Sequence, residues 1–163
     1  MASYRGGTRT NNEILTIFFT RLWELKIPSK IRILIWRIAH DYLPTLHNLR
    51  VRSLVVNTLC PVCQMEEESV DHLFRVCTFT QQVLWGVGVT VSTCNRESSW
   101  KNWLAAEFVN QSIEACKIRS IAYWAIWYNR NKLYHEGMRE QAHEVVGFIK
   151  AYYAETTILG ERL

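Results

Sequence analysis

The chain has 163 residues, of which 48% are hydrophobic and 12% are aromatic, and its formal net charge is +4. This length corresponds to about one domain, and the composition can build an ordinary core, which excludes a wholly disordered chain. The most apolar run, residues 31–39, contains two arginines and is too short to cross a bilayer. The opening MASYRGGTRTNNE lacks the apolar segment of a signal peptide, so we expect an intracellular protein, nuclear or cytoplasmic, with reduced thiols.

The positive charge is concentrated in the first third of the chain. Residues 1–52 hold nine Lys or Arg against three acidic residues, whereas the remainder is slightly acidic. A basic region can bind a polyanion, since neutralising phosphates is the main sequence-independent source of affinity for nucleic acids. A solvated basic face without a partner explains the same charge equally well, so both interpretations stay open.

Turn and capping residues divide the chain into helices, and alternating strand-like patterns are scarce. We therefore predict a mainly α fold. Thr10 and Glu13 have the spacing of a capping box, and the helix that they begin should end before Pro28. Its predicted buried side chains are Ile14, Leu15, Ile17, Phe18, Leu22 and Trp23.

A second helix is predicted between Pro28 and Pro44. Arg37 and Asp41 are spaced to pair on its surface, and a short helix over residues 46–54 should follow. The apolar stripe of the second helix comprises Ile31, Leu34, Ile35, Ile38 and Tyr42.

The second half of the chain contains four more predicted helices, each with a capping or terminating residue. Residues 90–99 between them form a predicted loop. The expected limits are Thr78 to Gly86 or Gly88, Ser98 or Ser99 to about residue 111, Ser112 to Gly137, and residues 139–159 closed by Gly160.

One short segment, LCPVCQMEEESVDHLFRVC at residues 59–77, has the spacing C-x2-C-x8-H-x4-C. Tetrahedral zinc needs four soft or borderline donors around one point, and four side chains here are of that kind. A small helical domain organised around a structural Zn²⁺, followed by a long-helix C-terminal segment, is the predicted architecture. The predicted ligands are Cys60, Cys63, His72 and Cys77.

The residues around these ligands support the same interpretation. Pro61 favours a tight turn between the first two cysteines, and Ser69 can cap a short helix that carries His72. The glutamates at positions 66–68 are predicted to form a solvated tip of the loop. Because protein side chains fill all four positions, such a site organises a fold and does not activate water.

Two other interpretations of the cysteines remain. A redox C-x-x-C disulfide usually opens a helix after a strand, and no βαβ pattern is present. Chance placement of unrelated buried thiols is the second, and two short ligand spacings make it less attractive. Cys94 and Cys116 lack comparable neighbours, and Cys116 is predicted to be a small core residue.

The order of motifs resembles the reverse-transcriptase zinc-binding domain of plant non-LTR retroelements. The matching motifs are LWELKIPSKIRILIWRIAHDYLPTLHNLRVRSL, LCPVC and EEESVDHLFRVC, with VLW close behind. The resemblance implies that Cys60, Cys63, His72 and Cys77 are the zinc ligands. It also implies three segments: an N-terminal lead-in at 1–21, the zinc-binding domain at 22–90, and a helical part at 91–163 that resembles the linker before a ribonuclease H domain.

The sequence does not favour catalysis. Nucleotidyl transfer and ribonuclease H hydrolysis need clustered carboxylates that hold Mg²⁺, but the only aspartates are Asp41 and Asp71, far apart in sequence. We therefore expect no catalytic residues, no small-molecule substrate and no membrane partner.

Two functions remain as hypotheses. The first is binding of RNA or DNA through the basic third of the chain. The second is a host-adopted protein interaction or regulatory module, in which Trp124, Trp127 and Tyr128 contact a protein partner if they are exposed. The predicted nucleic-acid contacts are Lys26, Lys30, Arg32, Arg37, Arg50 and Arg52.

Overall fold

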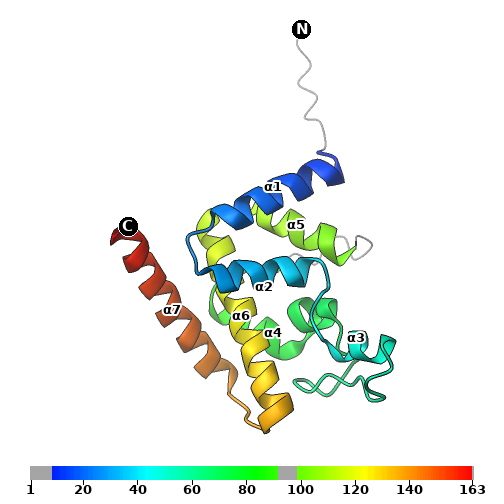
Figure 1. Ribbon diagram of the computed structural model, residues 1–163. Helices are drawn as coiled ribbons and strands as arrows, with labels where there is room; N and C mark the ends of the chain where they lie inside the picture. The colour runs from blue at the N-terminus through cyan, green and yellow to red at the C-terminus, as the bar shows by residue number, and fades with distance from the viewer. Residues whose placement is uncertain (1–8, 92–98, 163) are drawn as a thin grey trace.

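The computed structural model describes residues 9–91 and 99–162, and its regular structure is almost entirely helical (Figure 1). Within these residues, extended pairing is limited to one bridge between Leu59 and Glu67. The predicted mainly α fold is confirmed. The elements are α1 (Asn11–Glu24), α2 (Ser29–Ala39), α3 (Leu46–Val51), the π-helix η1 (His72–Val76), α4 (Thr78–Gly86), α5 (Trp100–Asn110), α6 (Ile113–Glu136) and α7 (Ala142–Arg162).

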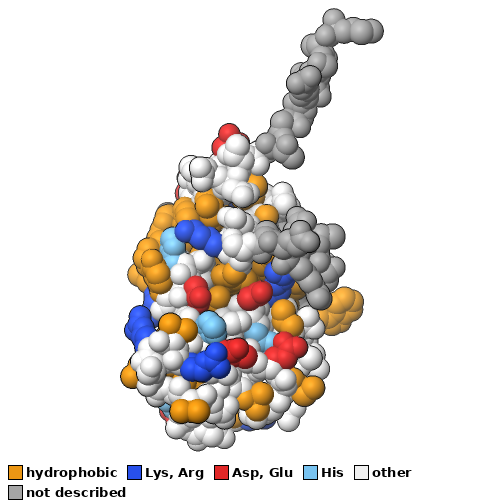
Figure 2. Space-filling view, turned by 90° about the vertical axis from the view of Figure 1, so that its right-hand side faces the viewer, with side chains coloured by type: hydrophobic (Ala, Val, Ile, Leu, Met, Phe, Trp, Pro, Cys, Tyr) orange, Lys and Arg blue, Asp and Glu red, His pale blue; other side chains and the backbone are white. Residues whose placement is uncertain are grey.

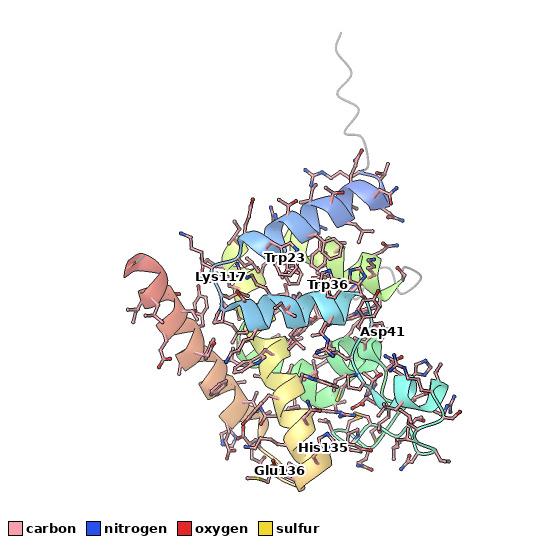
Figure 3. The ribbon with its side chains drawn as sticks, viewed as in Figure 1. Trp23, Trp36, Asp41, Lys117, His135 and Glu136 are labelled. Atoms are coloured by element: carbon pink, nitrogen blue, oxygen red, sulfur yellow. The ribbon has the colours of Figure 1, made fainter. Side chains whose placement is uncertain are left out.

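The first helix begins as its capping box predicts. The Thr10 hydroxyl accepts a hydrogen bond from the Glu13 amide, and the Glu13 carboxylate accepts one from the Thr10 amide. Phe18 and Leu22 are fully buried, but Trp23 is 46% exposed, so its predicted burial is wrong. It lies in the last turn of α1, shortly before the Pro28 turn (Figure 3).

The end of α2 differs from the prediction. The helix stops at Ala39, and Asp41 takes a left-handed backbone conformation with φ of +56°. This turn moves Tyr42 off the predicted stripe and leaves it 60% exposed. The predicted Arg37–Asp41 pair is not formed among the described residues, because Asp41 instead accepts a hydrogen bond from Asn48 Nδ2 at 2.9 Å. The other four stripe residues are buried: Ile31, Leu34, Ile35 and Ile38.

Several later helix limits follow their predicted caps. Ser99 and Ser112 accept hydrogen bonds from backbone amides at the starts of α5 and α6, and Gly137 closes α6 with φ of +68°. In contrast, Thr78 is the first residue of α4 and not its cap, and α3 ends at Val51, earlier than predicted.

The predicted stop at Gly160 is also wrong, because α7 continues to Arg162. A single glycine inside a helix costs only about 0.5–1 kcal/mol relative to alanine, which is not enough to end α7. Most of the predicted 90–99 loop, with Cys94 and Ser98, lies outside the described residues.

The helices pack around one continuous core that extends from Phe18 in α1 to Ile149 in α7. In Figure 1, α1 lies along α5, and α6 runs between α2 and α7, consistent with the contacts between these elements. Helix α7 also packs on α4, where Gly86 faces Val146. The segment that carries the Cys-His motif lies beside α3 in Figure 1, and its Cys60, Leu73 and Cys77 belong to the same core.

Candidate metal centre

The structure brings the four predicted ligand side chains together. One donor atom from each of Cys60, Cys63, His72 and Cys77 lies within 4.8 Å of every other. His72 Nε2 is 3.2 Å from the Cys63 sulfur. Cys60 and Cys77 are fully buried, and His72 is 6% exposed. The four cysteines among the described residues are free, so no disulfide joins Cys60 to Cys63.

A tight turn positions the first two thiols. The Gln64 amide donates to the Cys60 carbonyl at 2.9 Å, and Gln64 adopts a left-handed φ of +59°. The Cys60 amide donates to the Glu66 carbonyl at 2.8 Å, next to the Leu59–Glu67 bridge. Pro61 lies inside this turn, as predicted. The backbone therefore returns on itself and holds both sulfurs on the same side.

A π-turn positions the second pair. Ser69 accepts a hydrogen bond from the His72 amide at 3.1 Å, which confirms Ser69 as the predicted cap. The Cys77 amide donates to the His72 carbonyl at 2.7 Å, across five residues. A wider turn of this kind is uncommon and occurs often at functional sites. It accounts for the four-residue spacing, because it returns Cys77 to the side of the chain that carries His72.

Glu66 lies beside the imidazole of His72. Its Oε2 is 3.4 Å from His72 Nδ1, and that nitrogen is buried with no closer hydrogen-bond partner in the described structure. Metal-bound histidines usually donate their second ring N–H to a carboxylate, a carbonyl or water. Glu66 is in place to accept such a bond, while Nε2 points toward the sulfurs.

Protonation in the cluster reflects the crowding of its thiols. The hydrogen bond with Cys77, and then burial, raise the pKa of Cys60 to about 12. The same hydrogen bond lowers the pKa of Cys77. The hydrogen bond with Cys60 is the main reason that the pKa of His72 is raised to about 9. Several thiolates in so small a buried volume repel each other unless a cation neutralises them.

The donor set fits zinc. Bond lengths of about 2.3 Å for Zn–S and about 2.0–2.1 Å for Zn–N place tetrahedral ligand atoms roughly 3.5–3.8 Å apart. The observed spread of up to 4.8 Å is close to that requirement, so small side-chain adjustments are enough. Three sulfurs and one imidazole are soft or borderline donors, unlike the oxygen sets that Mg²⁺ and Ca²⁺ prefer.

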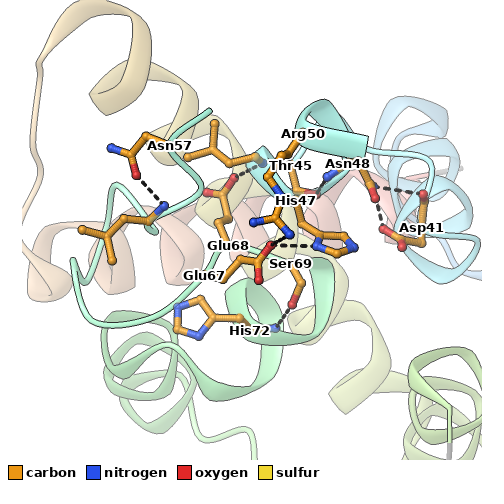
Figure 4. Close-up of polar contacts among 12 residues, drawn as sticks. Asp41, Thr45, His47, Asn48, Arg50, Asn57, Glu67, Glu68, Ser69 and His72 are labelled. Carbon is orange, nitrogen blue, oxygen red and sulfur yellow. Dashed lines mark hydrogen bonds and ion pairs between the residues drawn. The ribbon is translucent and has the colours of Figure 1, made fainter. Parts of the chain in front are cut away.

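Glu68 does not lie in a solvated tip, and the prediction for this residue is wrong. Glu66 and Glu67 are exposed, but Glu68 is fully buried. Its Oε1 accepts hydrogen bonds from the Leu46 amide at 2.9 Å and from Arg130 at 2.5 Å, and its Oε2 accepts a second bond from Arg130 at 2.8 Å. Figure 4 shows Glu68 reaching toward α3, with the exposed His47–Glu67 contact beside it.

Two arginines that the sequence analysis did not select connect this loop to the C-terminal helices. Arg130 of α6 pairs with Glu68, and Arg139 donates to the carbonyl oxygens of Pro61 and Val62 in the cysteine turn. Helix α6 also carries Lys117, Arg119 and Lys132, so its sequence did not distinguish Arg130. The sequence contained no indication that its partner was 62 residues away.

The six predicted nucleic-acid contacts divide into two groups. Lys26, Lys30 and Arg32 lie at the amino-terminal end of α2, whereas the other three lie near its carboxyl end or on α3. Arg32 donates hydrogen bonds to the backbone of Trp23 and Leu25 and to Ser29. The face in Figure 2 accordingly mixes basic, acidic and hydrophobic side chains. The second group consists of Arg37, Arg50 and Arg52.

Comparison with known protein families shows to which family the chain belongs. The family described as zinc-binding in reverse transcriptase matches residues 4–85, which is half of the chain. The chain therefore belongs to this reverse-transcriptase zinc-binding family.

A curated relative is similar to part of the chain. It is an Arabidopsis thaliana protein named "Putative ribonuclease H protein", 28% identical over 60 residues, which cover 37% of this chain and 10% of the relative. The match thus spans about a tenth of the relative's length. No solved structure matches the chain.

Within residues 9–91 and 99–162, no helix is long and apolar enough to cross a membrane.

Proposed function

We propose that this chain is a non-catalytic module that binds nucleic acid and whose fold depends on a structural Zn²⁺. The observation that supports it most directly is that the Arg37 and Arg52 side chains have no bonding partner among the described residues. Neither guanidinium forms an ion pair or a hydrogen bond with another described residue, although both lie where the carboxyl end of α2 meets α3. Most arginines elsewhere in the described chain are bonded to protein atoms, such as Arg21, Arg119 and Arg130.

The proposed zinc is structural because protein side chains supply all four donors. Cys60, Cys63, His72 and Cys77 leave no coordination position for water or substrate. The ion would tie the turn after α3 to η1, and this loop is joined to α6 through Glu68 and Arg130. Metal binding at such a site contributes directly to folding free energy.

The absence of catalysis is also part of the proposal. The cysteine-histidine group is the one cluster in the described part of the chain that can hold a metal, and it contains no carboxylate. Asp71 lies 3.6 Å from Arg75, and Asp41 is bonded to Asn48, so each aspartate has a structural partner. The activity named for the Arabidopsis relative belongs to a protein about ten times longer than the matched segment.

Fluorescence anisotropy with labelled single-stranded RNA, single-stranded DNA and duplex DNA tests the proposal. Binding should weaken steeply with salt, because each neutralised phosphate releases condensed counterions. A neutral dextran of similar mass serves as a control for non-specific association. If the chain binds none of the three nucleic acids at low salt, the nucleic-acid function is wrong.

A second candidate function is protein interaction through an aromatic surface on α6 and α7. The Trp124 ring contacts those of Tyr128, Phe148 and Tyr152, and Tyr128 and Phe148 are 54% and 46% exposed. Exposed aromatic residues are common anchors in interfaces. Trp124 itself is half-buried under Lys30, which is 4.8 Å from its ring centre. Tyr128→Ala should leave nucleic-acid affinity unchanged if this surface serves a protein partner.

A further inference from the structure

Three rings stack at the end of α2. The imidazole of His40 lies between the rings of Phe19 and Tyr42, 5.3 Å from each centroid and within 17° of parallel to both. Trp36 supports the stack with edge contacts to His40 and Tyr42. Burial, followed by the nearby charge of Lys101, lowers the pKa of His40, so its ring is neutral at pH 7.

One end of this ring stack is exposed to solvent. Phe19 is half-buried against α5, whereas Tyr42, at the other end, is 60% exposed. His40 stacks on one face of the Tyr42 ring and Trp36 contacts the ring at an angle of 66°, so the face away from His40 is the one open to a further stacked ring. This orientation results from the left-handed turn at Asp41, which takes Tyr42 out of the helix.

Tyr42 lines a groove of about 390 Å³ between the end of α2 and α3. The charged residues that line it are Arg37, Arg52 and Asp41, which gives the groove a net positive charge. Asp41 is held by Asn48, while the two arginines have no partner among the described residues. Figure 3 places Asp41 and Trp36 at this end of α2.

We propose that this groove binds one nucleotide of a single-stranded nucleic acid, with its base stacked on Tyr42 and its phosphate paired with Arg37 and Arg52. The inference rests on the nucleic-acid function proposed above and assigns it a site. An exposed aromatic face beside arginines is the arrangement that binds single strands without sequence preference. A duplex is excluded, because its bases already stack on each other and cannot reach the ring.

The position of the groove also determines which of the predicted basic residues can contact the nucleic acid. Arg32 is bonded to backbone and hydroxyl oxygens, and Lys30 lies over Trp124, at the opposite end of α2. These residues are distant from Tyr42 along the helix. We therefore assign phosphate binding to Arg37 and Arg52, and a structural role to Arg32.

Tyr42→Ala and Tyr42→Phe test the stack in the full chain. With a labelled oligouridylate of about ten nucleotides, Tyr42→Ala should raise the dissociation constant about 5- to 100-fold, and Tyr42→Phe should leave it nearly unchanged. Tyr128→Ala, an equally exposed tyrosine on α6, is the matched control and should bind like the unaltered chain. A thymidine oligomer of equal length distinguishes RNA from DNA as the preferred strand.

Arg37→Gln and Arg52→Gln test the phosphate contact. Each should reduce the slope of log K against log salt by about 0.7, the value for one phosphate of a single strand. Lys150→Gln on α7, an exposed lysine without a described partner, is the matched charge control and should not change the slope. Ultraviolet cross-linking should attach uridine to the tryptic peptide of residues 38–50, which contains Tyr42.

The outcomes separate the two proposals. If the unaltered chain binds no single strand, both the nucleic-acid function and this site are wrong. If it binds, but Tyr42→Ala and Tyr128→Ala have equal affinities, the site is wrong while the nucleic-acid function stands. Tighter binding to duplex than to single strands would also overturn the site.

Discussion

Glu68 and Arg130 form a buried ion pair that joins the cysteine-histidine loop, residues 59–77, to the long helix α6. The guanidinium donates two hydrogen bonds to the carboxylate, at 2.5 and 2.8 Å, and both side chains are at most 2% exposed. Arg130 also lies over the rings of Trp127 and Tyr134, at 4.9 and 4.7 Å. The metal centre and the C-terminal helices are therefore expected to be energetically coupled.

Glu68→Gln should destabilise the chain by about 3–5 kcal/mol, because removing one partner leaves the other charge buried and uncompensated. Urea unfolding monitored by circular dichroism measures this change. Glu67→Gln is the matched control, since Glu67 pairs with His47 and Arg50 at the surface, and should cost less than about 1 kcal/mol. Equal effects of the two substitutions would show that the buried pair does not couple the loop to α6.

Substitution of a proposed ligand should change the zinc dependence of stability, whereas substitution of Cys116, the remaining described cysteine, should not. Cys60→Ser and His72→Ala should each lower the unfolding free energy of the zinc-supplemented chain by several kcal/mol, since metal binding and folding are coupled. Cys116 is a buried thiol that donates to the Phe108 carbonyl, and burial raises its pKa. Cys116→Ala should therefore lose stability equally with and without zinc, whereas a ligand substitution should abolish the zinc dependence. A zinc dependence that survives His72→Ala would remove that residue from the ligand set.

His72 should make the metal-free and zinc-loaded chains respond to pH in opposite directions. Without metal, its pKa of about 9 lies above the ordinary value of 6.5, mainly because of the hydrogen bond with Cys60. Protonated His72 then contributes stability that is complete below pH 6.5 and is lost as pH rises through about 9. With zinc the imidazole must be neutral, so the loaded chain should release metal as pH falls.

Nuclear magnetic resonance titration of the His72 ring in the chelator-treated and zinc-loaded chains checks this difference. We expect a midpoint near 9 without zinc and no titration near that pH with zinc bound. The same midpoint in both samples would contradict metal coordination by His72.

The contact between α4 and α7 gives a further test of the packing. A Cβ added at Gly86 would lie 2.6 Å from Val146 Cγ2, so Gly86→Ala should cost about 1–3 kcal/mol through overpacking. Adding Val146→Ala should reverse much of that loss. Gly147→Ala, where an added Cβ meets nothing within 4 Å, should instead stabilise the helix by about 0.5–1 kcal/mol. Thermal unfolding of these three variants measures the changes, and a double variant no more stable than Gly86→Ala would contradict the α4–α7 packing.

The sequence was sufficient to predict features that depend on local spacing. The capping residues Thr10, Ser99 and Ser112 act within three residues of their partners, and the Cys-His motif lies within one short segment. These features were identified because their geometry is encoded by nearby residues.

Features that depend on distant packing were not predicted. Glu68 resembled its exposed neighbours, and only the position of Arg130 after folding makes its burial favourable. Tyr42 fitted the apolar stripe of α2, but the left-handed turn at Asp41 rotated it into solvent. The groove beside Tyr42 forms where α2 and α3 meet, so no single segment of sequence could indicate it.

Zinc content of the purified chain, measured by inductively coupled plasma mass spectrometry before and after chelation, tests the central claim most directly. We expect one zinc per chain, and removal of that zinc should reduce the helical circular dichroism signal and the resistance to urea. A chain that contains no zinc after purification in zinc-supplemented buffer, and that unfolds identically with and without a chelator, would contradict it.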